Sequence, residues 1–306
     1  MEMVQKTRQA RGFFTASDGV EISYTDVGEG VPFLWIHGWG GDAETQRPIL
    51  ELLSRFGFRC LCYDQRCCGR SAFTDNLGVP QSARDALELL EQLEIDDAVV
   101  LGYSMGAAVL FSYLEQFGTA RISRLIVGDM SPKPINDEEW KLGIYQGWYT
   151  QAQFERDLYN MDHHYEAFSA FFAEQTMFPH TPDERRDFDE SGEFALRARE
   201  RARAAGKEEL FHRLMAPPPE QNRRANRIYW ESCDSRDYRP CLARIDVPTA
   251  LFFASPGSLY RPETASWMAA RIPNATIRIF DGCTHLASGE KPLEFVSAIV
   301  DFVEKT

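Results

Sequence analysis

Short runs of continuously hydrophobic residues alternate along most of the chain with longer segments whose apolar positions recur at helical spacing. The runs cover residues 31–36, 59–63, 98–102, 124–127, 249–254 and 276–280. Continuous hydrophobicity is typical of a strand that is covered on both faces. With helical segments between the strands, the pattern predicts an α/β protein: a mostly parallel, doubly wound sheet with helices on both sides.

The two ends of the chain carry further predicted elements. Residues 12–16 and 20–27 alternate between apolar and polar and flank a turn at residues 17–19, which predicts an antiparallel hairpin at one edge of the sheet. Near the C-terminus, Pro292 is placed to begin a last helix, whose apolar residues recur on one face.

From about Lys133 to Asp237 the chain shows only helical patterns, rich in aromatic residues, and no convincing strand. Because this segment lies between the sixth and seventh strands, we expect it to form a helical cap, or lid, over the carboxyl edge of the sheet. The sequence thus predicts a core domain of residues 1–132 and 238–306 and a cap of residues 133–237.

Within the predicted cap, two residue pairs have the spacing of a helix-capping box. They are Asn136 with Glu139 and Thr150 with Gln153. In such a box the first residue and the one three positions later satisfy each other's backbone N–H groups at the start of a helix.

The net charge of the chain indicates which classes of partner it does not bind. The 306 residues include 33 Lys and Arg against 46 Asp and Glu, a formal net charge of −13. Nucleic-acid backbones and anionic membranes attract clusters of Lys and Arg, so we expect neither as a partner. The N-terminal segment lacks the apolar stretch of a signal peptide, and no apolar run reaches membrane-spanning length. We therefore expect a cytoplasmic protein that acts on a small-molecule substrate; its oligomeric state stays open, a homodimer included.

The seven cysteines are odd in number, and their spacing suggests neither a disulfide framework nor a zinc site. In a cytoplasmic protein we expect reduced thiols. Cys67 and Cys68 are neighbours in a predicted loop, where packing is the simplest role, and redox activity of this pair stays open. No metal is expected.

A serine stands between a strand and a helix at residues 102–106, which read G-Y-S-M-G. The motif follows the apolar run 98–102 and precedes a long helical segment, the context in which G-x-S-x-G exposes a nucleophile. A turn this tight strains the backbone, and side chains in place of its two glycines would clash. We expect Ser104 to be the nucleophile and the Met105 N–H, at the helix N-terminus, to face developing negative charge.

A second motif, H-G-W-G-G at residues 37–41, ends the apolar run 31–36. Its glycines let the backbone turn back so that a free N–H, that of Trp39, points at the same reacting oxygen as the Met105 N–H. These two N–H groups would form an oxyanion hole. His37 is expected to brace its loop by hydrogen bonding rather than to exchange protons.

A serine nucleophile needs a base, and histidine is the natural choice near neutral pH. Of the six histidines, four lie in the predicted cap, which leaves His37 and His285 in the sheet domain. His285 ends the segment D-G-C-T-H at residues 281–285, after the last apolar strand and before the last helix. A carboxylate must then hold the correct tautomer of His285.

Together these motifs, with D-Q-R-C-C-G-R-S at residues 64–71, resemble the α/β-hydrolase superfamily, in particular its cap-bearing branch of serine esterases, lactonases and perhydrolase-like proteins. The resemblance covers nearly the whole chain. It implies the α/β-hydrolase fold, with a helical cap inserted between the sixth and seventh strands. Cys67 stands where the family usually has glycine, which puts the local turn in question.

The catalytic acid is where this sequence departs from most of the superfamily. The acid usually follows the seventh strand, but residues 255–262 contain no carboxylate, and Glu263 is expected to begin a helix. Asp129 instead follows the sixth strand, a position that some branches of the family use, including certain dehalogenases and lactone hydrolases. We therefore predict that Asp129 orients His285, with a role as a loop anchor or helix cap as the alternative.

The sequence favours a serine hydrolase that cleaves a carboxylic ester or lactone through an acyl-enzyme on Ser104, without metal or cofactor. The cap is rich in aromatic residues, so an apolar substrate is expected, although most of these side chains would pack the cap itself. They are Trp140, Tyr145, Trp148, Tyr149, Phe168, Phe171 and Phe172.

Three alternatives use the same fold. A cofactor-independent dioxygenase would use the His–Asp pair without acylating a serine, and a C–C bond hydrolase would use the same triad on a ketone. A non-catalytic receptor would keep the pocket and bind a small ligand. Release of p-nitrophenol from short acyl esters would favour the ester hydrolase, and oxygen consumption with a heteroaromatic substrate would favour the dioxygenase.

Overall fold

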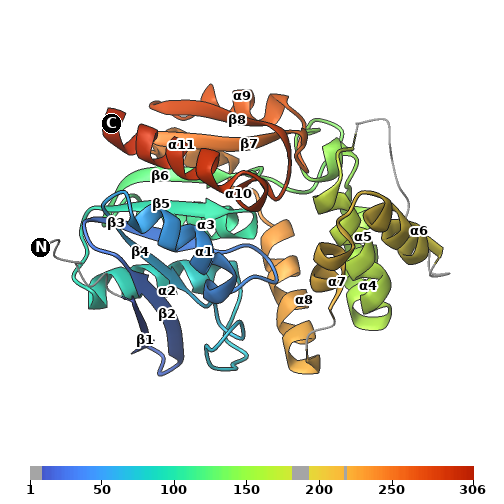
Figure 1. Ribbon diagram of the computed structural model, residues 1–306, viewed down its shortest axis with the longest axis horizontal. Helices are drawn as coiled ribbons and strands as arrows, with labels where there is room; N and C mark the ends of the chain where they lie inside the picture. Colours follow the sequence, from blue (N-terminus) through green and yellow to red (C-terminus); the bar gives the residue numbers. More distant parts are fainter. Residues whose placement is uncertain (1–8, 181–192, 217–218) are drawn as a thin grey trace, which may run out of the picture.

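The computed structural model describes residues 9–180, 193–216 and 219–306. The first eight residues, part of the segment in which we expect no signal peptide, lie outside the described residues. The described strands form one sheet in the order β1-β2-β4-β3-β5-β6-β7-β8 (Figure 1). They are β1 (Gln9–Thr15), β2 (Glu21–Val27), β3 (Val31–Ile36), β4 (Phe58–Tyr63), β5 (Ala98–Tyr103), β6 (Ile122–Gly128), β7 (Thr249–Gly257) and β8 (Ala275–Thr284).

Helices connect and cover these strands. In the sheet domain they are α1 (Ala43–Ser54), α2 (Val79–Gln92), α3 (Met105–Phe117), α9 (Glu263–Ala269), α10 (Ala287–Glu290) and α11 (Pro292–Lys305). Between β6 and β7 lie α4 (Gln151–His163), α5 (Tyr165–Met177), α6 (Glu193–Ala204), α7 (Glu208–Met215) and α8 (Glu220–Asp234), with the 3₁₀ turns η1 (Tyr145–Gly147) and η2 (Arg239–Arg244).

The strand directions confirm the predicted architecture. β1 and β2 form the antiparallel hairpin at one edge, β2 also pairs antiparallel with β4, and the remaining neighbouring pairs are parallel. The last helix begins at Pro292, as expected. β7 is longer than the predicted strand of residues 249–254, because its pairing with β8 continues to Gly257.

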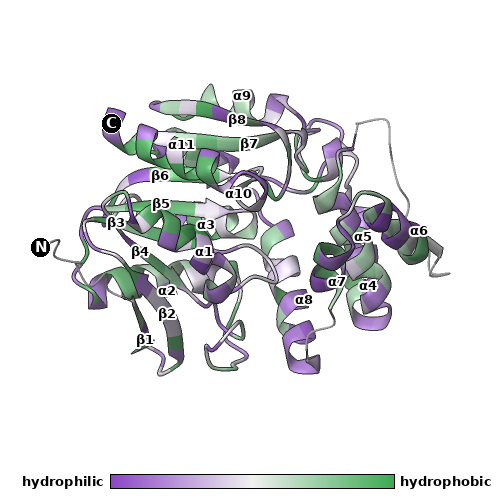
Figure 2. Cartoon of the chain, in the orientation of Figure 1, coloured by the Kyte–Doolittle hydropathy of each residue, from purple (hydrophilic) through white to green (hydrophobic). Residues whose placement is uncertain are grey.

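Each face of the sheet carries its own hydrophobic layer, since successive side chains of a strand point to opposite faces. On one face, Leu34 belongs to the cluster that includes Leu89 of α2 and Val109 of α3. On the other face, Trp35 packs against Phe295 of α11, in a cluster that also includes α1. The central strands are apolar along most of their length (Figure 2), as burial on both faces requires.

Between β6 and β7, the described residues form helices and turns beyond the carboxyl ends of the parallel strands (Figure 1). Thr150 precedes α4 with the predicted capping box. Asn136 does not begin a helix, contrary to expectation. Its backbone pairs with Thr150, and its side-chain amide bonds backbone groups of Gly143, Ile144 and Tyr149. An amide that fixes three groups of its own loop is no longer free to cap a helix.

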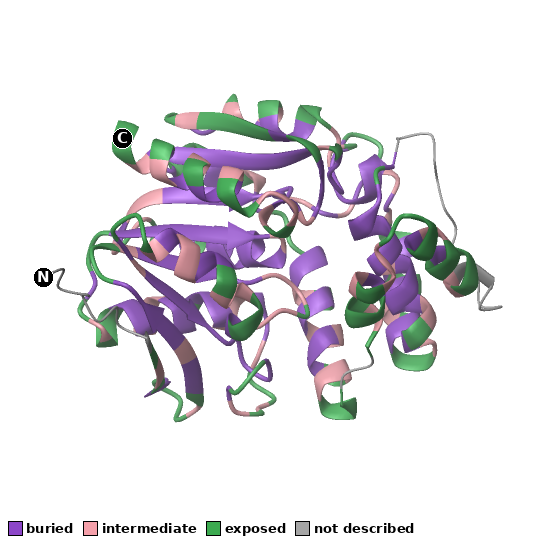
Figure 3. Ribbon diagram, viewed as in Figure 1, coloured by how far each residue is buried: buried purple, intermediate pink, exposed green. Residues whose placement is uncertain are grey.

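Helix α8 is anchored on the sheet domain as well as on the other inserted helices. The Tyr229 hydroxyl donates a hydrogen bond of 3.1 Å to the carbonyl of Arg66, and the Val79 N–H donates one of 2.9 Å to Ser232 Oγ. Much of the helix is buried, whereas α6 and α7 are largely exposed (Figure 3). The limits of the cap domain stay a prediction, but these contacts tie α8 to the core.

The seven cysteines are all buried and unpaired. Burial raises the pKa of the Cys68 thiol, which keeps this group in its less reactive protonated form. Among the helices that the structure describes, none combines the length and the apolar character needed to cross a membrane.

Candidate active site

Ser104 lies at the turn between β5 and α3, in the strand-to-helix context that the sequence predicts. Its backbone has a φ of 54° and a ψ of −127°, a conformation that a residue with a side chain rarely adopts. The Ser104 N–H donates a hydrogen bond of 2.8 Å to the carbonyl of Gly128, which ties the turn to the end of β6. This strained turn presents the serine hydroxyl at the carboxyl edge of the sheet.

The backbone around Ser104 leaves no room for side chains at its glycines. A methyl group at Gly106 would lie 2.0 Å from the carbonyl oxygen of Ile36, and one at Gly102 would lie 2.4 Å from that of Gly106. At Gly38 the added carbon would lie 3.2 Å from Ser104 Cβ. The glycines therefore let the H-G-W-G-G turn and the start of α3 approach Ser104 closely.

Ser104, His285 and Asp129 form one line of hydrogen-bonding groups. His285 follows β8, and its Nε2 lies 3.0 Å from Ser104 Oγ. On the other side of the ring, Nδ1 lies 2.5 Å from Asp129 Oδ2. With the ring proton on Nδ1, the histidine donates to the carboxylate, and Nε2 is free to accept from the serine hydroxyl. Glu263 is exposed at the start of α9, so the carboxylate in contact with the ring is that of Asp129.

Residues of β7 and the loop after it hold the Asp129 carboxylate, a contact that sequence reasoning missed. Ser258 Oγ donates a hydrogen bond of 2.6 Å to Asp129 Oδ1, and the Ala254 N–H donates to the same oxygen at 3.4 Å. The Asp129 N–H donates in turn to the carbonyl of Phe252 at 2.7 Å. Ser258 cannot carry a charge, but its hydroxyl orients the residue that does. The available signal was a serine just past the strand after which most relatives carry their acid.

The two predicted oxyanion donors lie beside Ser104. Met105 is the first residue of α3, so its N–H has no acceptor within the helix. Trp39 follows Gly38, whose backbone packs against Ser104. The indole N–H of Trp39 donates to the carbonyl of Asn226 at 2.8 Å, which links this residue to α8. A role of the two backbone N–H groups in binding an oxyanion stays a prediction.

His37 braces its loop, as expected. Its Nε2 accepts the Gln65 N–H at 3.1 Å, and the Gln65 side-chain amide donates to the His37 carbonyl at 2.8 Å. Burial lowers the pKa of His37, so the imidazole is neutral near pH 7 and can accept this hydrogen bond.

The D-Q-R-C-C-G-R-S segment follows β4 and contacts the His37 loop through Gln65. Arg66 is buried and binds the carboxylates of both Asp85 and Asp18. Cys67 has a φ of 61°, in the left-handed region that glycine occupies without strain, which explains why the family usually has glycine here. Its thiol contacts the backbone of Thr74, with Sγ 3.3 Å from the carbonyl and 3.4 Å from the N–H. The departure from glycine thus leaves the turn intact.

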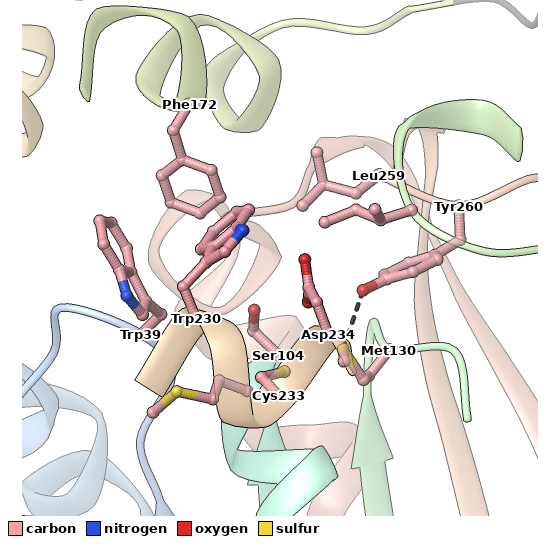
Figure 4. Close-up of a pocket in the computed structure, with 11 residues that line it drawn as sticks. Trp39, Ser104, Met130, Phe172, Trp230, Cys233, Asp234, Leu259 and Tyr260 are labelled. Atoms are coloured by element: carbon pink, nitrogen blue, oxygen red, sulfur yellow. Dashed lines mark hydrogen bonds between the residues drawn. The ribbon is translucent and has the colours of Figure 1, made fainter. Parts of the chain in front are cut away.

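A small pocket lies at Ser104 (Figure 4). Most of its wall is apolar. The side chains around the serine belong to Trp39, Met105, Met130, Ile144, Phe172, Trp230, Cys233, Asp234, Leu259 and Tyr260. The Trp39 ring packs edge-to-face against both Phe172 and Trp230, so the sheet domain and the inserted helices form this wall together.

Few of the cap aromatics that the sequence singles out reach this pocket. Phe172 lines it. Tyr145 stacks on Trp148 and packs edge-to-face against Phe171, inside the inserted segment. Among the described residues, no three His, Cys, Asp or Glu side chains are grouped so that they could hold a metal ion.

Asp234, the last residue of α8, is a pocket residue that sequence reasoning missed. Its side chain is buried, and burial raises its pKa to about 8. It continues a stripe of buried side chains on α8 that includes Tyr229, Trp230 and Cys233. A carboxyl group at the end of such a stripe is the signal that could have revealed it.

The profile of the alpha/beta hydrolase fold family matches residues 31–292 of the chain. This chain belongs to the α/β-hydrolase fold family. The match spans the turn at Trp39, the serine turn and the segment with His285.

Individual α/β hydrolases resemble the chain along nearly its full length. It is 24% identical to the non-heme chloroperoxidase CPO-A1 of Kitasatospora aureofaciens, over 95% of this chain and 98% of that protein. Among solved structures, an esterase from Exiguobacterium antarcticum has a TM-score of 0.77 at 20% identity and covers 95% of this chain and 98% of its own. The enol-lactonase from Burkholderia xenovorans LB400 has a TM-score of 0.71 at 19% identity and covers 96% and 100%. At these identities, the solved structures show a shared fold.

Proposed function

We propose that this α/β hydrolase cleaves a carboxylic ester or lactone through an acyl-enzyme on Ser104. The observation that supports this most is the line of hydrogen-bonding groups from Ser104, in the wall of a largely apolar pocket, through His285 to Asp129. A strained serine whose hydroxyl lies within hydrogen-bond distance of an imidazole nitrogen is the arrangement that nucleophilic acyl transfer requires.

In the first half of the reaction, Ser104 Oγ attacks the carbonyl carbon of the substrate while His285 Nε2 takes the hydroxyl proton. The imidazolium that forms is stabilised by the Asp129 carboxylate at Nδ1. When the tetrahedral intermediate collapses, the bond to the leaving alcohol breaks, and His285 gives its proton to the departing oxygen. The product of this half is an ester between Ser104 and the acyl group.

In the second half, water attacks the acyl-enzyme, and His285 again serves as the base. Collapse of this intermediate releases the carboxylic acid and returns the proton to Ser104. For a lactone, acid and alcohol leave as one molecule. In both halves the carbonyl oxygen becomes negative, and the Met105 and Trp39 N–H groups are the donors that we propose for it.

The pocket supports a substrate with an apolar body. Trp39, Phe172 and Trp230 present aromatic surface next to the serine (Figure 4). Substrate carbon groups would gain free energy by leaving water for this surface. Seven buried, unpaired thiols support the cytoplasmic location that we propose for the protein.

A fluorophosphonate probe tests the nucleophile directly, because it forms a covalent bond with an activated serine. We expect one phosphonyl adduct by intact mass, mapped to Ser104 by peptide analysis. The Ser104→Ala variant should take up no probe and lose ester hydrolysis by about 10³-fold or more. Ser123→Ala, near the start of β6 and so away from the carboxyl edge of the sheet, is the matched control and should label like the unaltered protein. Ester turnover by Ser104→Ala within tenfold of the unaltered enzyme would contradict the mechanism.

Substrate assays separate this function from its alternatives. We expect release of p-nitrophenol from short acyl esters. Oxygen consumption with a heteroaromatic substrate, without ester turnover, would favour a dioxygenase instead. Because the curated relative is named a chloroperoxidase, hydrogen peroxide should be tested as a second acyl acceptor beside water. Its attack on the acyl-enzyme would release a peracid and free Ser104.

A further inference from the structure

A carboxyl group in the wall of the catalytic pocket has no part in the proposed acyl transfer. Asp234 is buried, with 4% of its surface exposed, and its carboxyl group faces the space next to Ser104 (Figure 4). Within the described parts of the chain, its Oδ2 has no hydrogen-bond partner. A buried polar atom without a partner is destabilising, so its retention beside a pocket points to a ligand that supplies the missing partner.

Behind Asp234 lies a second buried carboxyl group, that of Asp157 on α4. Asp157 Oδ2 accepts a hydrogen bond of 2.9 Å from the Tyr149 hydroxyl. The indole N–H of Trp230 donates to the same hydroxyl oxygen at 3.0 Å.

The Tyr149 hydroxyl has a single proton, which its hydrogen bond to Asp157 uses. Asp234 therefore receives no proton from this tyrosine, and its Oδ2 is left without a partner among the described residues. A proton that Asp234 offers to a ligand must be its own.

The electrostatic surroundings of Asp234 favour its protonated form. Burial is the main cause that raises the pKa of Asp234, to about 8, and the nearby Asp157 raises it further. Burial also raises the pKa of Asp157, to about 7. Among the described residues that line the pocket, none is a lysine or an arginine that could stabilise the ionised form. At neutral pH, Asp234 thus offers the pocket an uncharged carboxylic acid.

We propose that Asp234 determines substrate specificity by donating a hydrogen bond to a neutral oxygen of the substrate, such as a ketone or a second ester carbonyl. The inference rests on the proposed function, since the oxygen belongs to the same molecule whose ester bond Ser104 attacks. A substrate anion would find no cation in the pocket wall to balance its charge. The substrate class is therefore an ester or lactone with an apolar body and one additional neutral carbonyl oxygen.

Matched esters test this assignment on the unaltered protein. p-Nitrophenyl hexanoate is compared with its 4-oxo and 5-oxo derivatives, which differ from it only by one ketone in place of a methylene. We expect at least one oxo ester to have a kcat/KM about tenfold higher than the hexanoate, mainly through a lower KM, since one neutral hydrogen bond in a buried site has about this effect. This comparison does not depend on whether a variant folds.

Variants then locate the effect. Asp234→Leu should remove the preference for the oxo ester, measured as the ratio of the two kcat/KM values. Asp234→Asn should retain part of it, because the amide N–H can still donate. Glu231→Gln, on the exposed side of the same helix, is the matched control and should leave the ratio unchanged.

The possible failures are distinguishable. Absence of any ester turnover, with no fluorophosphonate label on Ser104, would overturn the proposed function and this inference with it. Turnover of the hexanoate without a preference for either oxo ester would overturn only the role of Asp234. A preference for p-nitrophenyl 6-aminohexanoate over both oxo esters would do the same, since an ammonium group requires an ionised carboxylate. A preference for an oxo ester that persists in Asp234→Leu would also overturn the role of Asp234.

Discussion

The hydroxyl of Ser258 donates a hydrogen bond of 2.6 Å to Oδ1 of Asp129, whose other oxygen lies 2.5 Å from His285 Nδ1. The acid and its hydrogen-bond donor thus come from two neighbouring strands, with Asp129 after β6 and Ser258 after β7. Ser258 occupies the side of the site from which most relatives supply the acid itself. Its hydroxyl limits the directions in which the Asp129 carboxylate can turn, and so acts on the histidine through the acid.

Removal of this hydroxyl should weaken catalysis without abolishing it. We expect Ser258→Ala to lower kcat by roughly tenfold, since a hydrogen bond to a charged group is lost while the contact between Asp129 and His285 remains. Ser258→Thr keeps the hydroxyl and should restore most of the rate. Steady-state kinetics with one p-nitrophenyl ester, and the rate of fluorophosphonate labelling, should fall in parallel. A purely structural role would lower the melting temperature and leave both rates per folded molecule unchanged.

Loss of the Asp129 charge should have a far larger effect. Asp129→Asn preserves the shape of the side chain but cannot stabilise the imidazolium of His285, and it favours the wrong tautomer. We expect kcat to fall by about 10³–10⁴-fold. Glu263→Gln, at an exposed position on α9, is the control and should change kcat little. A near-normal rate for Asp129→Asn would refute the assignment of the acid.

The serine turn gives a prediction about stability. Gly106→Ala would place a carbon 2.0 Å from the Ile36 carbonyl oxygen, so β3 and the start of α3 would have to move apart. We expect a loss of about 3 kcal/mol of unfolding free energy, the upper range for overpacking, measured by chemical denaturation. Gly289→Ala, in α10, adds its carbon where nothing lies within 4 Å and should be neutral or slightly stabilising. Equal stability of the two variants would contradict the described packing at Gly106.

The parts of this site that the sequence predicts are those whose positions follow from the strands and helices next to them. The G-Y-S-M-G turn could be recognised because a strand and a helix flank it, and tight backbone packing requires its glycines. Asp129 could be predicted because β-strand order brings residues after β6 and β8 to the same edge of the sheet. In both cases, the sheet itself positions the side chain.

The contacts around Asp234 could not be predicted in this way. Asp234 is far along the chain from Tyr149 and Asp157, and it lies near them only because α8 packs against α4. The packing angle of inserted helices is set by side-chain shapes, which a pattern of apolar positions does not specify. Ser258 was not predicted for a related reason. Its role depends on one hydrogen bond, and the direction of that bond depends on the path of a loop.

The buried Asp234 carboxyl group also predicts how stability depends on pH. Its pKa is about 8 in the folded protein against 3.8 for an ordinary aspartate, so between these values the folded state binds a proton that the unfolded state releases. Stability from this group is therefore full below about pH 4 and declines as the pH rises toward 8, by up to about 1.4 kcal/mol per pH unit. Asp234→Asn has no titrating group at this position. The melting temperature of the variant minus that of the unaltered protein should therefore increase by at least about 2 °C between pH 5 and pH 8.

The titratable groups that face Asp234 are Asp157, Tyr149, Cys233, Tyr145 and Tyr260. Asp157 has the same sign and remains in the variant, so some decline with pH should persist. Glu231→Gln, exposed on the same helix, should follow the unaltered protein at every pH, and a constant difference between Asp234→Asn and the unaltered protein would show that Asp234 is ionised in the folded state.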